Sequence, residues 1–145
     1  MAVNLTDKAR ELLLSGDLNL TSDALHFILL GSAYVFDPDD EDVADVVACE
    51  ISGTGYTGGF GGSGRKEVTT KTFGHDGTSH LAYLTCANPE WTSIDAGTIS
   101  AIGVFKLGAA DSSSLLIGAL DVVDVVTNGG TWTYEISADG LLTLE

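Results

Sequence analysis

The stretch from Lys66 to Cys86, KEVTTKTFGHDGTSHLAYLTC, decides the fold class. Residues alternate in character from Lys66 to Phe73, Asp76-Gly77 is a strong hairpin turn, and an apolar run returns from Ser79 to Cys86. Alternation with a period of two indicates a strand that buries one face. The stretch therefore predicts a β-hairpin and directs attention to similar short segments on either side.

Further segments with strand character lie outside this hairpin and are separated by turn signals such as Asn128-Gly129-Gly130 and Asp139-Gly140. The candidate strands are Asp23 to Leu30, Thr98 to Leu107, Leu115 to Val123, Thr131 to Ser137 and Leu141 to Leu144. The first is almost continuously apolar, which predicts burial on both of its faces. Six or seven strands with little helix between them predict a mainly β fold, an antiparallel β-sandwich of immunoglobulin-like or jelly-roll-like type.

Two short helices are expected outside the strands. Thr6-Asp7 supplies a capping residue in front of residues 8–14, and Ser15-Gly16 supplies a stop. Asp37 suits the cap, and Pro38 the first helical position, of a short acidic helix that continues into Val47. The N-terminal helix is too short to be stable alone in water, so its leucines must dock on the domain or on a neighbouring subunit.

The length and composition favour one folded unit. A chain of 145 residues supports one hydrophobic core, and 44% apolar against 19% charged residues is typical of a folded protein. We therefore expect a single β-sandwich domain over residues 1–145, with residues 1–20 as a candidate N-terminal docking segment.

The charge and the cysteines exclude several classes of protein. A net charge of −15, from 21 acidic and 6 basic residues, disfavours binding to nucleic acid and to anionic membranes. No signal peptide or membrane span is apparent, so we expect a soluble protein made in the cytosol. Cys49 and Cys86 lack CxxC spacing and are expected to be two buried, unpaired thiols.

Metal sites are only weakly indicated. An acidic block could offer oxygen ligands to calcium, but an EF-hand loop counted from its start would need Gly and Glu where Asp42 and Ala48 stand, so a solvated helix start is preferred. His75 and His80 straddle the predicted hairpin turn, yet neither they nor His26 have a third partner in a recognised pattern. We expect no metal and no cofactor. The acidic block consists of Asp37, Asp39, Asp40, Glu41, Asp42 and Asp45.

Catalytic motifs are not supported either. The Gly-rich segment, residues 50–64, matches GxGxxG by letter from Gly53 to Gly58, but no helix is expected after it to hold a pyrophosphate, and no Gly-Lys-Ser/Thr follows. The serines at 52, 63 and 112–114 lack a nucleophile-elbow motif. Core packing is expected, rather than a ligand platform, for Trp91, Phe105, Trp132 and Tyr134. The sequence thus predicts a protein that is not an enzyme.

Segments along nearly the whole chain follow a recognisable order. They are KARELL at 8–13, DALHFILL at 23–30, EISGTGYTGG at 50–59, Trp91 ahead of Ile99 to Lys106, LLIGALD at 115–121, NGGTWTY at 128–134 and ADGLL at 138–142. In this order they resemble a family of small tailed-bacteriophage virion structural proteins. The chain departs from the family pattern in the extra glycine and Ser63-Gly64-Arg65 after Tyr56.

The resemblance implies a virion component and not an enzyme. Packaged DNA repels a strongly acidic chain, so the outer surface of the head is the expected location, with a role as a capsid decoration or cement protein. The expected partners are the major capsid protein and copies of the chain itself, with a trimer as the expected symmetric form. The expected contact residues are Leu5, Leu12 and Leu13 in the N-terminal segment and Tyr56 and Phe60 in the Gly-rich segment.

Three alternatives stay open at this stage. A tail or fibre-base protein would use exposed loops such as Gly108 to Ser114. A calcium-binding or glycan-binding module would use the acidic block from Asp37 to Asp45 or Trp91. The five contact residues could instead simply cover the ends of the sandwich.

Overall fold

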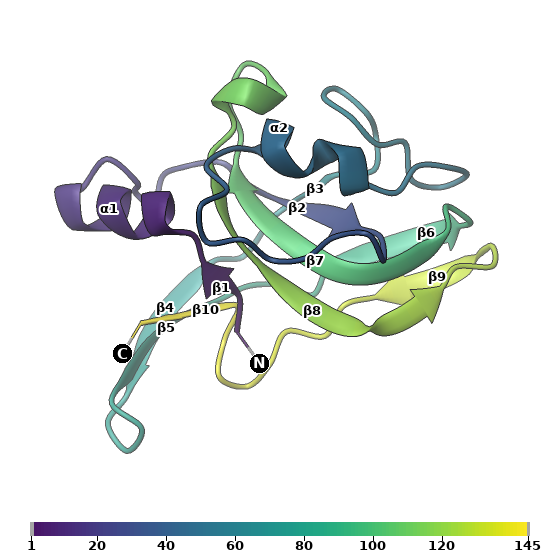
Figure 1. Ribbon diagram of the computed structural model, residues 1–145. Helices are drawn as coiled ribbons and strands as arrows, with labels where there is room; N and C mark the ends of the chain where they lie inside the picture. The colour runs from purple at the N-terminus through teal and green to yellow at the C-terminus, as the bar shows by residue number, and fades with distance from the viewer. Residues whose placement is uncertain (1, 145) are drawn as a thin grey trace.

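The main sheet forms from the longest apolar runs of the chain. In the computed structural model, which describes residues 2–144, β2 (Leu25–Leu30), β7 (Thr98–Lys106) and β8 (Leu116–Val126) lie next to one another (Figure 1). They form the centre of a five-stranded sheet of order β1-β8-β7-β2-β3. The edge strands are β1 (Asn4–Leu5) and β3 (Lys66–Glu67). All four pairings are antiparallel.

Two smaller antiparallel sheets complete the β structure. One has the order β10-β5-β4 and the other pairs β6 with β9. The predicted mainly β, antiparallel, sandwich-like fold is therefore confirmed. The bounds of these strands are β4 Thr72–Asp76, β5 Leu81–Thr85, β6 Glu90–Ile94, β9 Gly130–Thr133 and β10 Leu142–Leu144.

Strand β2 is buried on both faces, as its apolar run predicts. Leu25, Phe27 and Leu29 belong to the larger core cluster, which includes Leu84, Trp91 and Leu142 from the smaller sheets. Ile28 and Leu30 point to the opposite face, because side chains alternate along a strand, and join a second cluster with residues of α2 (Val43–Val46). The five-stranded sheet is thus covered on both sides.

The N-terminal helix begins and ends where its capping residues predict. α1 runs from Asp7 to Ser15, and the Thr6 hydroxyl accepts a hydrogen bond from the Ala9 amide at 3.2 Å. Gly16 has a φ of +83°, the left-handed conformation that ends many helices. Ala9 is fully buried, so this helix packs on the domain.

The acidic helix begins later than predicted. Its cap is Asp42, whose carboxylate accepts from the Ala44 amide at 2.9 Å, and not Asp37. The Glu41 carbonyl accepts a hydrogen bond from the Leu116 amide, and Asp42 forms an antiparallel β-bridge with Leu115, just before β8. These two contacts hold Glu41 and Asp42 in an extended conformation. α2 is therefore only four residues long and is followed by a 3₁₀ turn at Val47–Cys49; a second 3₁₀ turn lies at Asp111–Ser113.

The predicted hairpin exists, but its first strand is shorter than predicted. The alternating run from Lys66 to Phe73 is divided between β3, which pairs with β2, and β4, because Thr70 adopts a φ of +55° between them. The Asp76-Gly77 turn is confirmed, with Asp76 opposite Leu81. In Figure 1 this hairpin of β4 and β5 projects from the body of the protein.

Candidate functional site

The Gly-rich segment is organised by one buried carboxylate. Glu50 Oε1 accepts hydrogen bonds from Tyr56 Oη and Arg65 Nε, both at 2.9 Å. Glu50 Oε2 accepts from the Gly59 amide at 2.7 Å and from Arg65 Nη2 at 2.8 Å. The side chains of Glu50 and Arg65 are only 2% and 6% exposed. The segment is therefore closed by an ion pair that has been withdrawn from water.

Arg65 extends this network to the rest of the protein. Its Nη1 and Nη2 donate to the Asp111 carboxylate, and its guanidinium lies over the Phe105 ring at 5.4 Å from the centroid. Burial acts to lower the Arg65 pKa, but hydrogen bonds and charges from Glu50 and Asp111 outweigh burial and raise it. Arg65 thus remains charged and joins the segment to β7 and to the 3₁₀ turn at Asp111.

Tyr56 is a core residue and not a surface anchor. Its side chain is fully buried, and its hydroxyl accepts from the Leu29 amide at 3.0 Å while it donates to Glu50. Burial, followed by the Glu50 charge, raises the pKa of the Tyr56 hydroxyl. The expectation that Tyr56 presents an exposed contact is therefore wrong for this structure. Phe60, with 49% of its side chain exposed, is the predicted contact of the segment that does reach the surface.

Glycine is required at specific points of this packing. A Cβ atom at Gly64 would lie 2.6 Å from the Tyr56 ring, and the Gly64 carbonyl accepts from Trp91 Nε1 at 2.7 Å. Gly55 has a φ of +74° in a tight turn closed between Gly53 and Tyr56. The GxGxxG letters therefore serve close backbone packing, and the chain continues into loop and not into a helix.

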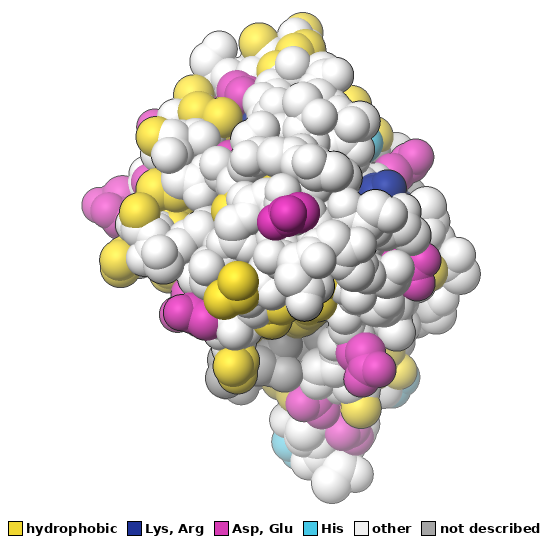
Figure 2. Space-filling view, turned by 90° about the vertical axis from the view of Figure 1, so that its right-hand side faces the viewer, with side chains coloured by type: hydrophobic (Ala, Val, Ile, Leu, Met, Phe, Trp, Pro, Cys, Tyr) yellow, Lys and Arg dark blue, Asp and Glu magenta, His cyan; other side chains and the backbone are white. Residues whose placement is uncertain are grey.

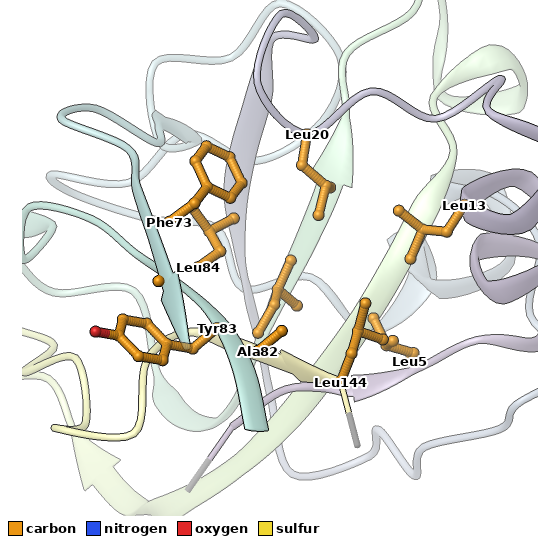
Figure 3. Close-up of a pocket in the computed structure, with 10 residues that line it drawn as sticks. Leu5, Leu13, Leu20, Phe73, Ala82, Tyr83, Leu84 and Leu144 are labelled. Carbon is orange, nitrogen blue, oxygen red and sulfur yellow. The ribbon is translucent and has the colours of Figure 1, made fainter. Parts of the chain in front are cut away.

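An apolar groove lies between α1 and the sheet of β4, β5 and β10. Figure 3 shows Leu13 from α1 and Leu5 from β1 on one side, with Leu20, Phe73 and Leu84 across from them and Leu144 beside Leu5. Tyr83 is turned away from the other side chains. The hollow has a volume of about 140 Å³. Ten residues line it: Leu5, Leu13, Leu20, Phe73, Gly74, Ala82, Tyr83, Leu84, Leu142 and Leu144.

The groove continues past Leu13 along the outer side of α1. This extension is lined by Arg10, Leu14 and Thr143 in addition to residues of β1. Leu14 is 91% exposed, and Phe73 and Leu144 are nearly half exposed. Among residues 2–144, the lining of the groove and its extension contains no acidic side chain, although the whole chain has 21. The hollow itself is therefore apolar, and its extension mixes apolar side chains with Asn4, Arg10 and Thr143, on a protein that is otherwise strongly acidic.

The three predicted docking leucines differ in burial and in whether they line the groove. Leu5 is 6% exposed and pairs with Gly118 of β8, whereas Leu12 and Leu13 are partly buried against the core. Leu5 and Leu13 both line the groove, while Leu12 does not. The exposed Leu14 was missed, although three consecutive leucines on a short helix cannot all face the core.

The acidic block is engaged in backbone turns. Asp37 accepts from the Asp39 amide at 3.0 Å, and Asp45 accepts from the amides of Glu41 and Asp42 at 2.9 and 3.2 Å. Burial, with the neighbouring carboxylates, raises the Asp40 pKa. Among the described residues 2–144, no three His, Cys, Asp or Glu side chains converge as metal ligands.

His75 and His80 line one open hollow at the β4–β5 hairpin, and the other histidine and the two cysteines are not part of its lining. His75 and His80 are exposed at the tip of the β4–β5 hairpin, while His26 lies against Phe105 with a ring separation of 5.6 Å. Burial lowers the His26 pKa, and its Nδ1 has no hydrogen-bond partner. Cys49 and Cys86 are unpaired, as predicted, but partly exposed and not fully buried. Burial raises the pKa of the Cys86 thiol to about 11.

Three of the four predicted core aromatics lie in a row that starts on the paired strands β6 and β9. Trp91 is fully buried and lies over Trp132 at a ring separation of 5.3 Å, and Tyr134 follows Trp132 at 6.2 Å. Phe105 is also fully buried. Core packing of Trp91 and Phe105, in two different clusters, is therefore confirmed. Trp132 and Tyr134 pack against the cluster of Trp91 while partly exposed.

Comparisons of this chain with protein-family models, with curated proteins and with solved structures found no match. In the part of the chain that the structure describes, no helix has both the length and the apolar character needed to cross a bilayer.

Proposed function

We propose that this chain is a non-enzymatic virion structural protein of a tailed bacteriophage, which decorates the outer face of the head and stabilises it. The family resemblance along nearly the whole sequence motivates the proposal. The observation that carries it is the apolar groove without acidic lining on a chain of net charge −15, because an apolar surface of this kind is typical of protein–protein contact.

The distribution of positive charge supports the outer face as the location. Within residues 2–144, every basic residue except Lys66 is engaged by an internal partner. Figure 2 shows acidic side chains spread over one face of the molecule with few basic ones among them. Because the field around such a protein is negative, packaged DNA repels it and basic regions of a shell protein attract it. The partners are Lys8 with Glu11, Arg10 with Asp7, Arg65 with Glu50 and Asp111, Lys106 with Asp23, and Lys71 with the carbonyls of Leu20 and Asp23.

The hydrogen bonds that hold the Gly-rich segment support a cementing role. The Gly-rich segment is held by Glu50 and Arg65 without a partner, which lowers the cost of ordering the loop that presents Phe60. Many copies that each contact neighbouring shell subunits would combine modest affinities into strong resistance to internal pressure. Partners of this protein are thus the major capsid protein and further copies of the chain.

An add-back experiment tests the proposal. Purified protein is added to heads that lack it, and bound protein and the temperature of DNA release are measured together. We expect saturable binding to the head surface and a higher release temperature, with gold-labelled antibody placing the protein on the head. Binding confined to the tail would favour a tail or fibre-base protein, and the absence of binding would contradict both virion roles.

A further inference from the structure

We propose that the apolar groove is the site of a two-fold symmetric dimer, in which each copy of this chain inserts its Leu14 into the groove of the other. The inference goes beyond the virion role and stands on the groove, on the exposure of Leu14 and on the distribution of charge.

The first step is the position of Leu14. Its side chain is 91% exposed in the last turn of α1, whereas its neighbours Leu12 and Leu13 pack against the core. Leu14 lines the same extension that includes Leu5, Leu13 and Leu144. A projecting apolar side chain therefore lies beside an apolar hollow on one face of the molecule. A two-fold interface uses the same patch on both subunits, and this face supplies both halves of such a contact.

The second step is size. The hollow between Leu13, Phe73 and Leu84 has a volume of about 140 Å³, and its lining residues Phe73 and Leu144 are nearly half exposed. An apolar cavity of about 150 Å³ is large enough to bind benzene. One leucine side chain therefore fits the hollow, and a large secondary-structure element is not needed to fill it.

The third step is charge, which decides where two such acidic chains can meet. Each copy carries −15, so association is opposed over most of the surface. α1 contains two acidic and two basic residues, paired as Lys8 with Glu11 and Arg10 with Asp7, both within 2.9 Å. The groove lining adds no acidic side chain within residues 2–144. The charges along α1 are thus balanced, and the exposed carboxylate of Asp17 follows the helix. A second copy therefore meets mainly paired charges and few free carboxylates on this face.

Val123 is exposed like Leu14 but has acidic neighbours. Val123 on β8 is 88% exposed, but Asp121 and Asp124 on either side of it are exposed as well. Pairing two copies through this strand would bring four carboxylates together. Val123 therefore provides a matched control position with similar exposure and an unfavourable setting for self-association.

Sedimentation equilibrium of the full chain tests the dimer directly. We expect a monomer–dimer equilibrium that shifts toward the dimer as salt is raised, because salt screens the repulsion between the two copies. Leu14→Gln keeps helix propensity and net charge and should raise the dimer Kd at least about 100-fold, since two leucines lose their burial in each dimer. Val123→Thr, with a side chain of nearly the same shape, should leave the Kd unchanged.

A second variant addresses the hollow itself. Ala82→Phe places a large side chain at an exposed position of the lining and should also prevent dimerisation. An equimolar mixture of Leu14→Gln and Ala82→Phe should form a heterodimer with one intact contact, while each variant alone stays monomeric. Circular dichroism and the thermal melting of each monomer verify that both variants are folded.

Three outcomes would overturn the inference. They are a wild-type monomer at all concentrations up to about 100 μM, a dimer that persists in Leu14→Gln, and a trimer, because a closed ring of three uses two different faces. A monomer that nevertheless binds heads would assign the groove to a shell segment and leave the virion role intact. A dimer that is absent from particles would support the groove as a self-association site and contradict the virion role.

Discussion

Arg65 donates two parallel hydrogen bonds to Glu50, from Nε to Oε1 at 2.9 Å and from Nη2 to Oε2 at 2.8 Å. Both side chains are almost fully buried. These residues are separated by 15 positions and enclose the whole Gly-rich segment. A run of glycines that is entropically costly to order is thereby fixed at its two ends. The conformation of the loop depends on this pair.

Replacing Arg65 should therefore destabilise the protein strongly. Arg65→Met leaves the Glu50 carboxylate buried without its counter-charge, and we expect the free energy of unfolding to fall by about 3–5 kcal/mol. Urea denaturation measures the change. Lys8→Met, which removes the exposed pair with Glu11, is the control and should leave the midpoint unchanged. Equal effects of the two substitutions would contradict the role of Arg65.

The Tyr56 hydroxyl should contribute separately to stability. Tyr56→Phe keeps the ring but removes the donor to Glu50 and the acceptor for the Leu29 amide, at an expected cost of about 1–3 kcal/mol. Tyr83→Phe, on the projecting hairpin, is the matched control and should be nearly neutral. If Tyr56→Phe were as stable as the wild type, the buried network would not organise the segment.

Phe60 should contribute to binding to heads. Phe60→Ser removes the half-exposed ring, so we expect weaker binding at unchanged thermal stability. Val35→Thr, at an 81% exposed position, controls for the loss of surface apolar area in general. Titration of each variant onto decoration-free heads makes the measurement. Unaltered affinity of Phe60→Ser would remove this residue from the contact surface.

His26 should make stability depend on pH. Burial lowers its pKa in the folded protein, so below the ordinary value of about 6.5 the unfolded chain binds more protons at this site. The contribution of His26 is therefore complete above that value and is lost as the pH falls toward the folded pKa. Glu67 opposes the shift and Arg65 adds to it.

Comparison with a variant isolates this effect from the other titrating groups. Denaturation of the wild type and of His26→Phe between pH 5 and pH 7.5 should give a stability difference that grows in favour of the wild type as the pH rises. A difference that stays constant over this range would show that His26 titrates normally in the folded state.

Local patterns were sufficient for elements whose signals are local. Thr6 and Gly16 mark the two ends of α1. Apolar runs between turn residues predicted the central strands of the main sheet, with β7 within one residue of its observed bounds. β8 extends to Val126, three residues past its predicted end, and β9 ends at Thr133, short of the predicted Ser137. Strand ends depend on where a partner strand stops, which the sequence of one strand does not contain.

Other features depend on contacts between distant segments. Asp37 and Asp42 are equally good caps by type, and the pairing of Glu41 and Asp42 with Leu115 and Leu116 selects the second. β6 was missed because Pro89 precedes it and Ser93 interrupts it with a φ of +52°.

The candidate site was predictable only in part. The N-terminal leucines were recognisable as an apolar docking face, and Leu5 and Leu13 do line the groove. The opposite wall, with Phe73 and Leu84, comes from a hairpin some 60 residues later, so no local pattern joins the two walls. Tyr56 and Phe60 are both aromatic residues among glycines, and only the long-range partners Glu50 and Arg65 place one inside and leave the other exposed.

The central claim, a structural role on the head of a phage particle, is tested most directly by counting copies of the chain in purified particles against the major shell protein. The account predicts a copy number comparable to that of the shell subunits. A copy number of only a few per particle would move the protein to the tail, and particles without the chain would contradict the account.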